Sequence, residues 1–237
     1  MTVVPKGLPS ALAALWQDAG TPARTRGLTR ERIVEAAIDL ADEDGLSALS
    51  MGRLAQRLRC GTMSLYRHVA NKDELITFML SAAPGAPPAL PDGDDWRGAV
   101  TAWADGLWEV YHRHPWVLSA AAAGPPADPG QLGWLDRGLT ALSPTGLSER
   151  DKLAAVMAVL HYVRGAAALD VAAGESDVVF GDLLRQVADA ARFPAVAAAL
   201  EAGAFDGETD RLADFRRGLA QVVDGIAGRV GAPGRVR

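Results

Sequence analysis

The chain has 237 residues, of which 49% are hydrophobic, so it can bury one large core or two small ones. Acidic residues outnumber basic residues by 29 to 24, and a single cysteine excludes an internal disulfide. No apolar run approaches the roughly 20 residues of a membrane-spanning helix, and the N-terminus lacks the basic-then-apolar pattern of a secretory signal. We therefore expect a globular protein of the cytoplasm that does not enter the membrane.

The charge is unevenly distributed along the chain. Residues 1–72 contain ten basic and seven acidic residues, whereas residues 73–237 contain fourteen basic and twenty-two acidic residues. This distribution indicates an anionic partner for the first part only. Within it, residues 1–27 are expected to form a partly ordered N-terminal extension or, alternatively, to place Arg24 and Arg26 in a DNA minor groove as a basic arm.

Residues 29–45 predict the first helix of a small domain. Thr29 can cap the N-terminus of this helix, Glu31 stands where the helix dipole favours an acid, and Gly45 can end the helix. The apolar residues on its inner face recur at helical spacing: Ile33, Ala36, Ala37 and Leu40.

Residues 46–72 predict two short helices joined by a tight turn, and they contain five basic residues and no acidic residue. Ser50 can cap the first helix, Cys60-Gly61 breaks it, and Thr62 can cap the second. In a helix-turn-helix, the second helix enters the DNA major groove by its N-terminal end, where side chains meet base edges while flanking basic groups meet phosphates. The sequence therefore predicts an interface with double-stranded DNA.

The segment from Leu28 to Ala83 resembles the DNA-binding domain of the TetR/AcrR family of transcriptional repressors. The resemblance lies in ERIVEAAIDLADEDG, in LAQRL and above all in SLYRHVANKDEL, whose Leu-Tyr-x-His-Val-x-x-Lys order is typical of the family. The match covers about a quarter of the chain. Two positions depart from the family pattern: Gly52 stands where many members have a basic residue, and Arg59 stands where the turn usually has glycine.

The resemblance implies roles for individual residues. It implies that Thr29 aims the free backbone amides of its helix at a phosphate. It also implies that the helix that follows Asn71 links the DNA reader to a sensor, and that its displacement changes the distance between the two heads of a dimer. The predicted DNA interface consists of Thr29, Ser50, Met51, Arg53, Thr62, Met63, Ser64, Tyr66, Arg67, His68 and Lys72.

The proline- and glycine-rich residues 84–95 predict a linker between a domain of residues 28–83 and a domain of residues 96–237. Helical periodicity in the second domain covers about 96–114, 116–123, 131–142, 148–172 and 212–230, with an uncertain stretch between about 174 and 206. No alternating strand pattern occurs. We therefore predict an all-α protein with an N-terminal three-helix helix-turn-helix domain and a C-terminal helical bundle domain that dimerises.

Five of the six tryptophans fall within 39 residues of the second domain. Aromatic rings serve either as core filler or as the walls of an apolar ligand pocket, so both interpretations stay open. We predict that a small apolar or aromatic effector binds here, with His161 and Tyr162 as polar groups. The predicted lining is Trp103, Leu107, Tyr111, Trp134, Met157, His161 and Tyr162.

Two long helices near the C-terminus have apolar edges that need partners. A symmetric four-helix bundle with two helices from each subunit would bury them, as the resemblance implies, whereas a monomer could fold them back on itself. The predicted homodimer interface consists of Leu153, Val156, Leu160, Phe215, Leu219, Val222 and Ile226.

The residues favour regulation over catalysis. His112 and His114 would project about 200° apart on a helix and could not easily share a metal ion, and no nucleophile motif or phosphate loop is present. We expect no cofactor and no metal. The predicted function is a repressor that leaves a palindromic operator when the effector binds; the alternatives are an α-helical enzyme and a ligand-independent architectural DNA-binding protein.

Overall fold

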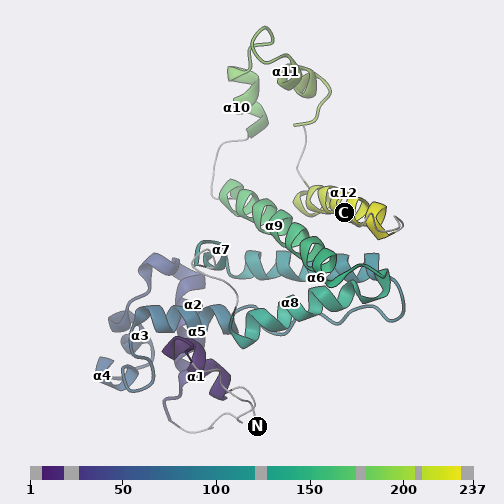
Figure 1. Ribbon diagram of the computed structural model, residues 1–237. Helices are drawn as coiled ribbons and strands as arrows, with labels where there is room; N and C mark the ends of the chain where they lie inside the picture. The colour runs from purple at the N-terminus through teal and green to yellow at the C-terminus, as the bar shows by residue number, and fades with distance from the viewer. Residues whose placement is uncertain (1–6, 19–26, 121–126, 175–179, 206–209, 231–237) are drawn as a thin grey trace.

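The computed structural model describes residues 7–18, 27–120, 127–174, 180–205 and 210–230, and it contains α-helices, short 3₁₀ turns and no β-strand in these ranges (Figure 1). The all-α prediction is therefore confirmed. The helices are α1 (Ser10–Asp18), α2 (Arg30–Asp44), α3 (Met51–Arg57), α4 (Thr62–Leu65), α5 (Lys72–Ala82), α6 (Trp96–Arg113), α7 (Trp116–Ala120), α8 (Pro129–Ala141), α9 (Glu149–Gly174), α10 (Phe180–Val187), α11 (Pro194–Glu201) and α12 (Arg211–Val230).

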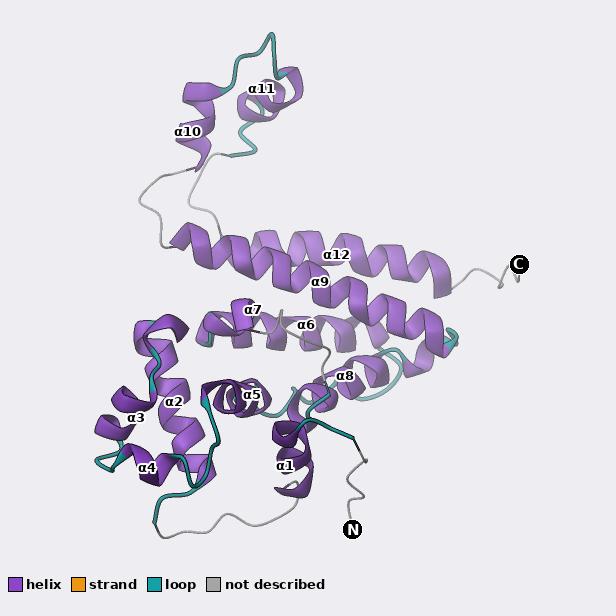
Figure 2. Ribbon diagram, turned by 60° about the vertical axis from the view of Figure 1, so that its left-hand side comes forward, coloured by secondary structure: helices purple, strands orange, loops and turns teal. Residues whose placement is uncertain are grey.

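Helices α2, α3 and α4 gather at one end of the molecule, and local capping sets most of their ends (Figure 2). Thr29 caps α2, Ser50 caps α3 and Asn71 caps α5, each by accepting a hydrogen bond from a backbone amide three residues further on. These caps satisfy amides that have no partner within the helix. Gly45 ends α2, as its place in the sequence predicted.

The predicted cap at Thr62 is wrong. Gly61 occupies the extended cap position and makes no side-chain hydrogen bond, so Thr62 is the first residue of α4. Helix α4 is only four residues long, and the chain continues after it as a turn in which the amides of His68 and Val69 both donate to the carbonyl of Leu65. The Thr62 side chain is consequently exposed.

The turn between α3 and α4 contains Arg59 with a φ of 53°. A left-handed conformation costs a residue with a side chain about 1–2 kcal/mol, and this is the position where the family usually has glycine. We predict that the Arg59→Gly variant is more stable than the Arg59→Ala variant by about 1 kcal/mol, because both remove the charge but only glycine removes the steric cost. Urea unfolding of the two proteins measures the difference, and equal midpoints would contradict it.

Within the predicted N-terminal extension, the structure describes residues 7–18, and Ser10–Asp18 form α1. Helix α1 packs against α5, and the indole nitrogen of Trp16 donates to the carbonyl of Ala127 at 3.0 Å, next to the start of α8. The segment is thus anchored to the body of the protein. Arg24 and Arg26, which the basic-arm alternative would use, lie outside the described residues.

The body of the protein is built from α6, α8 and α9, which pack against one another, with α12 lying along α9 (Figure 2). Glycines permit the closest contacts. A Cβ atom at Gly138 would lie 2.9 Å from the ring of Trp103, and a Cβ atom at Gly130 would lie 1.9 Å from the backbone oxygen of Ser81. These glycines therefore bring α8 against α6 and α5.

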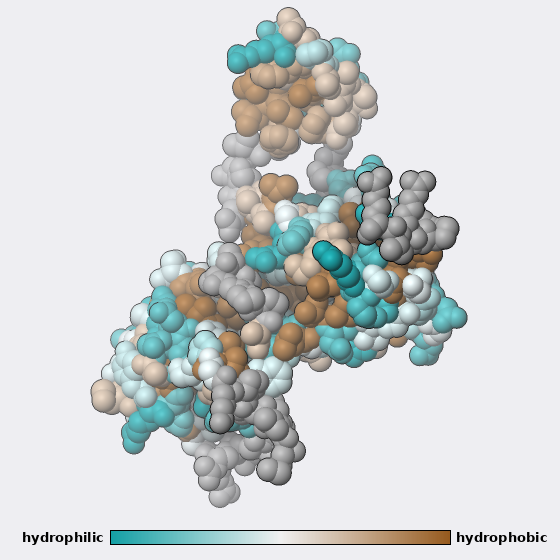
Figure 3. Space-filling model, in the orientation of Figure 1, coloured by the Kyte–Doolittle hydropathy of each residue, from teal (hydrophilic) through white to brown (hydrophobic). Residues whose placement is uncertain are grey.

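Helices α10 and α11 occupy the stretch that the sequence left uncertain, and they stand apart from the other described helices (Figure 1). Gly181 packs against Phe205, and the rings of Phe180 and Phe205 meet edge to face. Apolar surface gathers on this unit (Figure 3), with the side chains of Phe180, Leu183, Val187 and Phe193 among the exposed ones.

Several residues of the predicted dimer interface are buried within a single chain. Phe215, Leu219 and Ile226 of α12 are buried within a single chain, because α12 folds onto α9 and α6. Val156 is buried against α8, and Val222 is half-buried while its neighbour Val223 is buried. These residues therefore pack within one chain, and which residues contact a second subunit stays a prediction. Of the seven predicted residues, Leu153 alone is largely exposed.

Candidate nucleic-acid interface and ligand cavity

One face at the end of the molecule is built from α4 and the turn that follows it. Leu65 and Val69 are buried and anchor this segment to the core, which turns their neighbours outward. Met63 is 74% exposed and Tyr66 is 45% exposed. The side chains of Thr62 and Arg67 are also exposed, while Ser64, His68 and Lys72 are half-buried. This face can therefore present small polar groups, the apolar side chain of Met63 and cationic groups to a groove of DNA at the same time.

Hydrogen bonds within the chain organise this face. Arg67 donates to the hydroxyl of Ser64 at 3.2 Å, so the two predicted DNA-binding side chains are held together. Lys72 is the first residue of α5, whose cap Asn71 accepts from the amide of Glu74 at 2.8 Å. The carboxylate of Glu74 accepts from the amide of Ala70, which completes a capping arrangement and fixes the direction in which α5 leaves the face.

The basic residues of α3 are paired within the chain. Arg53 donates to Asp44 at 2.6 Å, and Arg57 forms two hydrogen bonds of 2.6 Å with Glu43. The Arg57 guanidinium lowers the pKa of Glu43, and Glu43 raises the pKa of Arg57. That Arg53 contacts DNA stays a prediction, and a phosphate would have to compete with Asp44 for it. Ser50 and Met51 lie beside it, as the cap and the half-buried first residue of α3.

The N-terminus of α2 lies near the same face. Thr29 accepts from the amide of Arg32 at 3.3 Å, and Glu31 has a lowered pKa because it accepts hydrogen bonds from its own backbone amide and from Thr29. The positive charge of the neighbouring Arg30 lowers it further. The predicted residues of α2, α4 and α5 thus share one end of the molecule.

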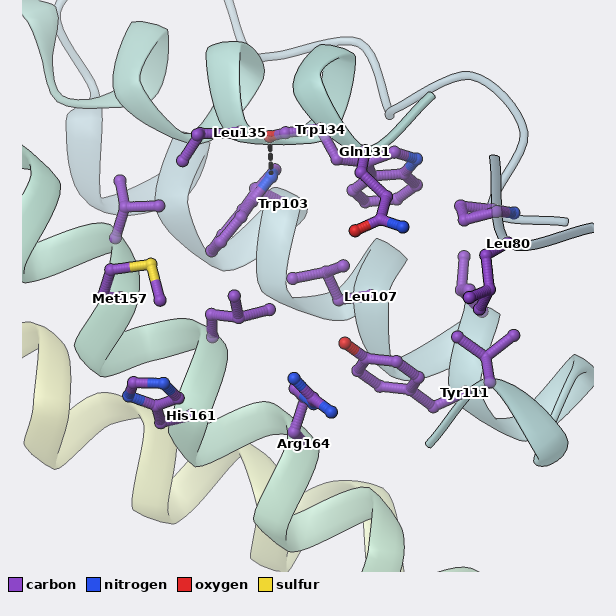
Figure 4. A pocket seen from close by; sticks show the side chains of 15 residues that line it. Leu80, Trp103, Leu107, Tyr111, Gln131, Trp134, Leu135, Met157, His161 and Arg164 are labelled. Carbon is purple, nitrogen blue, oxygen red and sulfur yellow. Dashed lines mark hydrogen bonds between the residues drawn. The ribbon is translucent and has the colours of Figure 1, made fainter. Parts of the chain in front are cut away.

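A cavity of about 260 Å³ lies among α5, α6, α7, α8 and α9. Six of the seven predicted lining residues contribute to its wall: Trp103, Leu107, Tyr111, Trp134, Met157 and His161. Figure 4 shows their side chains around one space, with those of α6 and α8 facing those of α9. That a ligand binds to these residues stays a prediction.

The polar edges of the two tryptophans point away from the cavity. The indole nitrogen of Trp103 donates to the carbonyl of Trp134 at 2.9 Å, and that of Trp134 donates to the carbonyl of Gly85 at 3.0 Å. Both rings are therefore fixed by backbone partners and present apolar faces to the space. Such a wall suits an apolar or aromatic molecule.

Tyr162 does not line this cavity, contrary to the prediction. Its hydroxyl donates to the carbonyl of Phe215 at 2.8 Å and its ring stacks on the ring of Phe215. Adjacent helical positions project about 100° apart, so a residue next to His161 turns toward α12 instead. Val156 and Leu160, which were predicted to contact a second subunit, line the cavity.

Several lining residues were missed by the sequence reasoning. Arg164 follows Met157 by seven residues and His161 by three, and Gln131 precedes Trp134 by three, so helical spacing could have found both. The others are apolar residues without a distinguishing signal: Leu80, Pro84, Val110, Val117 and Leu135.

Comparison with known proteins assigns the family. Residues 33–77 match the family model of bacterial regulatory proteins of the tetR family, and residues 87–230 match the tetracycline repressor-like C-terminal domain. The chain is 35% identical over 231 residues to the HTH-type transcriptional repressor DrrR1 of Streptomyces coeruleorubidus, covering 91% of this chain and 84% of the relative. The chain belongs to the tetR family of bacterial regulatory proteins.

Other members agree in sequence and in structure. The class A tetracycline repressor of transposon 1721 from Escherichia coli is 32% identical over 200 residues, covering 83% of this chain and 89% of that protein. The crystal structure of ActR from Streptomyces coelicolor superimposes with a TM-score of 0.73 at 26% identity, covering 87% of this chain and all of ActR. This tetR-family protein is therefore a DNA-binding transcriptional regulator and not an enzyme.

His112 and His114 both make contacts within the chain. His112 lies 2.7 Å from a carboxylate oxygen of Asp170, and the Nδ1 atom of His114 lies 2.9 Å from both carboxylate oxygens of Asp42. The indole nitrogen of Trp116 donates to the same Asp42 at 2.8 Å. Asp42 belongs to α2, whereas His114 and Trp116 lie where α6 ends and α7 begins. This cluster therefore connects the DNA-binding end of the chain to the helices that line the cavity.

Proposed function

We propose that this regulator is a homodimeric repressor that binds a palindromic operator and releases it when a small molecule enters the cavity. One observation carries the proposal: α5 has Lys72 of the DNA face at its start and Leu80 of the cavity wall near its end. A molecule that displaces the wall must therefore act on the helix that bears the DNA face. DNA binding implies a cytoplasmic location.

The chain divides, in this proposal, into four parts. Residues 1–27 form an N-terminal extension, residues 28–83 the DNA-binding domain, residues 84–95 a linker and residues 96–237 the ligand-binding and dimerisation domain. One family model ends at residue 77, before the linker, and the other begins at residue 87, within the linker. These ranges support the division.

The outer side of α9 supports the homodimer. This helix has 26 residues and is apolar enough to cross a membrane by length and composition, yet one side packs on α6, α8 and α12. The opposite side is exposed although it is mostly small and apolar: Leu153, Ala154, Ala158, Gly165, Ala168 and Leu169. Two copies of such a face can approach closely, and a symmetric contact would remove both from water.

The connection between cavity and DNA face has a second branch through α6. Trp103, Leu107 and Tyr111 line the cavity, and the next turn of the same helix ends at His114, which is buried and contacts Asp42. A ligand that binds the released state about 100-fold more tightly than the DNA-bound state supplies about 2.7 kcal/mol. That energy would release an operator held with little excess affinity.

A mobility-shift assay tests the function. The purified protein should retard DNA from upstream of its own or a neighbouring gene at concentrations that leave unrelated DNA free. Compounds that raise its melting temperature in a thermal-shift screen should then release that DNA. Equal affinity for all DNA, with no stabilising compound, would instead indicate an architectural protein.

Asp42→Ala is expected to weaken the response to such a compound. The change leaves the buried His114 ring and the Trp116 indole without their shared acceptor, which loosens the contact between α6 and α2. The ratio of operator affinities without and with compound should fall roughly 2- to 30-fold. Fluorescence anisotropy of labelled operator DNA measures it, and Glu35→Ala, an exposed acid on the same helix, is the control. An unchanged ratio would exclude this branch.

A further inference from the structure

The polar groups of the cavity wall share a chemical property. They are Tyr111, Gln131, His161 and Arg164, and no acidic side chain is among the described residues that line the cavity. This contrasts with residues 73–237 as a whole, in which acidic residues outnumber basic residues by twenty-two to fourteen. The cavity is therefore an apolar space whose polar groups favour negative charge inside an acidic body.

Arg164 supplies positive charge to this wall. Its side chain is half-buried, and its guanidinium makes no hydrogen bond or ion pair with any residue that the structure describes. Two arginines elsewhere in the body do pair with acids: Arg211 lies 3.3 Å from Asp170 and Arg216 lies 2.8 Å from Asp105. A guanidinium has five hydrogen-bond donors, and leaving most of them unused beside an apolar space is unfavourable. A ligand can supply the acceptors.

Tyr111 directs a second donor to the same place. Its ring is 5% exposed, and its hydroxyl has no hydrogen-bond partner in the described part of the chain. Burial raises the pKa of Tyr111 to about 12, so the hydroxyl keeps its proton at neutral pH and can donate it. Figure 4 shows this hydroxyl and the Arg164 guanidinium on the same side of the cavity, with the Gln131 carboxamide extending toward the space from α8.

We propose that the effector of this regulator is an acidic amphiphile, with an apolar ring-containing body against Trp103 and Leu107 and a carboxylate or similar acidic group bound by Arg164 and Tyr111. The planar guanidinium can bind two oxygens of one acidic group, and the tyrosine hydroxyl adds a third hydrogen bond. The Gln131 amide can donate a further one. The inference rests on the proposed function, because it names the chemical class of molecule that the regulatory cavity takes.

Two related fluorescent probes test the acidic group. Anilinonaphthalene sulfonate carries an apolar ring system and an anion, and N-phenyl-naphthylamine has the same ring system without the anion. We expect the wild-type protein to bind the sulfonate at least about tenfold more tightly than the neutral amine, in titrations followed by energy transfer from tryptophan. Arg164→Met should remove this preference by weakening sulfonate binding while leaving amine binding unchanged.

Controls separate the acidic site from a general change in the protein. Arg150→Met removes an exposed arginine from the start of α9, outside the cavity, and should keep the wild-type preference. If the Arg164→Met variant binds neither probe, the Tyr111→Phe variant provides the test. This change keeps the aromatic ring, and it should weaken binding of the sulfonate several-fold without affecting binding of the amine. Equal effects on both probes would overturn the inference.

Two further outcomes would also overturn it: wild-type protein without a preference for the sulfonate, and a preference that survives Arg164→Met. Neither outcome would test whether the protein is a ligand-released repressor. If neutral compounds from the thermal-shift screen still released the operator, the repressor mechanism would stand and only the acidic class would be excluded.

Discussion

Replacing Ala158 with glutamate is expected to separate the dimer into monomers. Ala158 is exposed on the outer side of α9, within the small apolar face proposed as the subunit contact. A symmetric contact would bury two added carboxylates without partners, and burying an unpaired charge costs several kcal/mol. Sedimentation velocity at micromolar concentration should show a halved mass.

The same substitution should weaken operator binding by at least about 100-fold. Once one DNA-binding domain of a dimer has bound its half-site, the second is held at a high effective concentration near the other half-site. This linkage typically raises the affinity for the palindrome by a factor of 10²–10⁴, which separate domains lack. Anisotropy titration of labelled operator DNA measures the loss. The Ala158→Ser variant should remain dimeric and bind normally, because serine is small and uncharged.

Phe215→Glu provides a contrast to the dimer prediction. Phe215 is 3% exposed and stacks on Trp108 and Tyr162, so glutamate there should unfold the chain and lower its melting temperature. Ala158→Glu should lower the mass while the helix content stays as in the wild type. A dimer that persists with glutamate at position 158 would exclude this face of α9 from the interface.

Removing the positive charges of Arg67 and Lys72 together should weaken operator binding roughly 100-fold at physiological salt. Both residues lie at the DNA face, and neither has an acidic partner among the described residues; Arg67 donates only to Ser64. In a dimer, the double change to alanine removes up to four phosphate contacts. The slope of log affinity against log salt should therefore become shallower by about 3 to 4.

The loss should be similar for operator and unrelated DNA, since phosphates do not report sequence. Thr62→Val and Ser64→Ala should instead change the preference among operator variants. Arg113→Ala combined with Arg150→Ala is the charge-matched control, because both arginines are exposed on the body. An unchanged salt slope in the Arg67 and Lys72 double variant would remove both residues from the interface.

The sequence by itself determined the features that depend on neighbours within a few residues. Thr29, Ser50 and Asn71 cap their helices as predicted, because a cap needs only the amide three residues further on. Helical spacing also placed Trp103 and Leu107 on one face of α6, and both line the cavity. The family followed from the order of residues between Leu65 and Lys72, which forms a local pattern.

Tertiary structure alone decided what each face meets. The apolar edge of α12 was visible in the sequence, but it packs on α9 of the same chain, so Phe215 belongs to the core of a single chain. The contact of Asp42 with His114 joins positions 72 residues apart. Periodicity says which side chains point the same way, whereas the packing of distant helices decides whether they meet a core, a cavity or water.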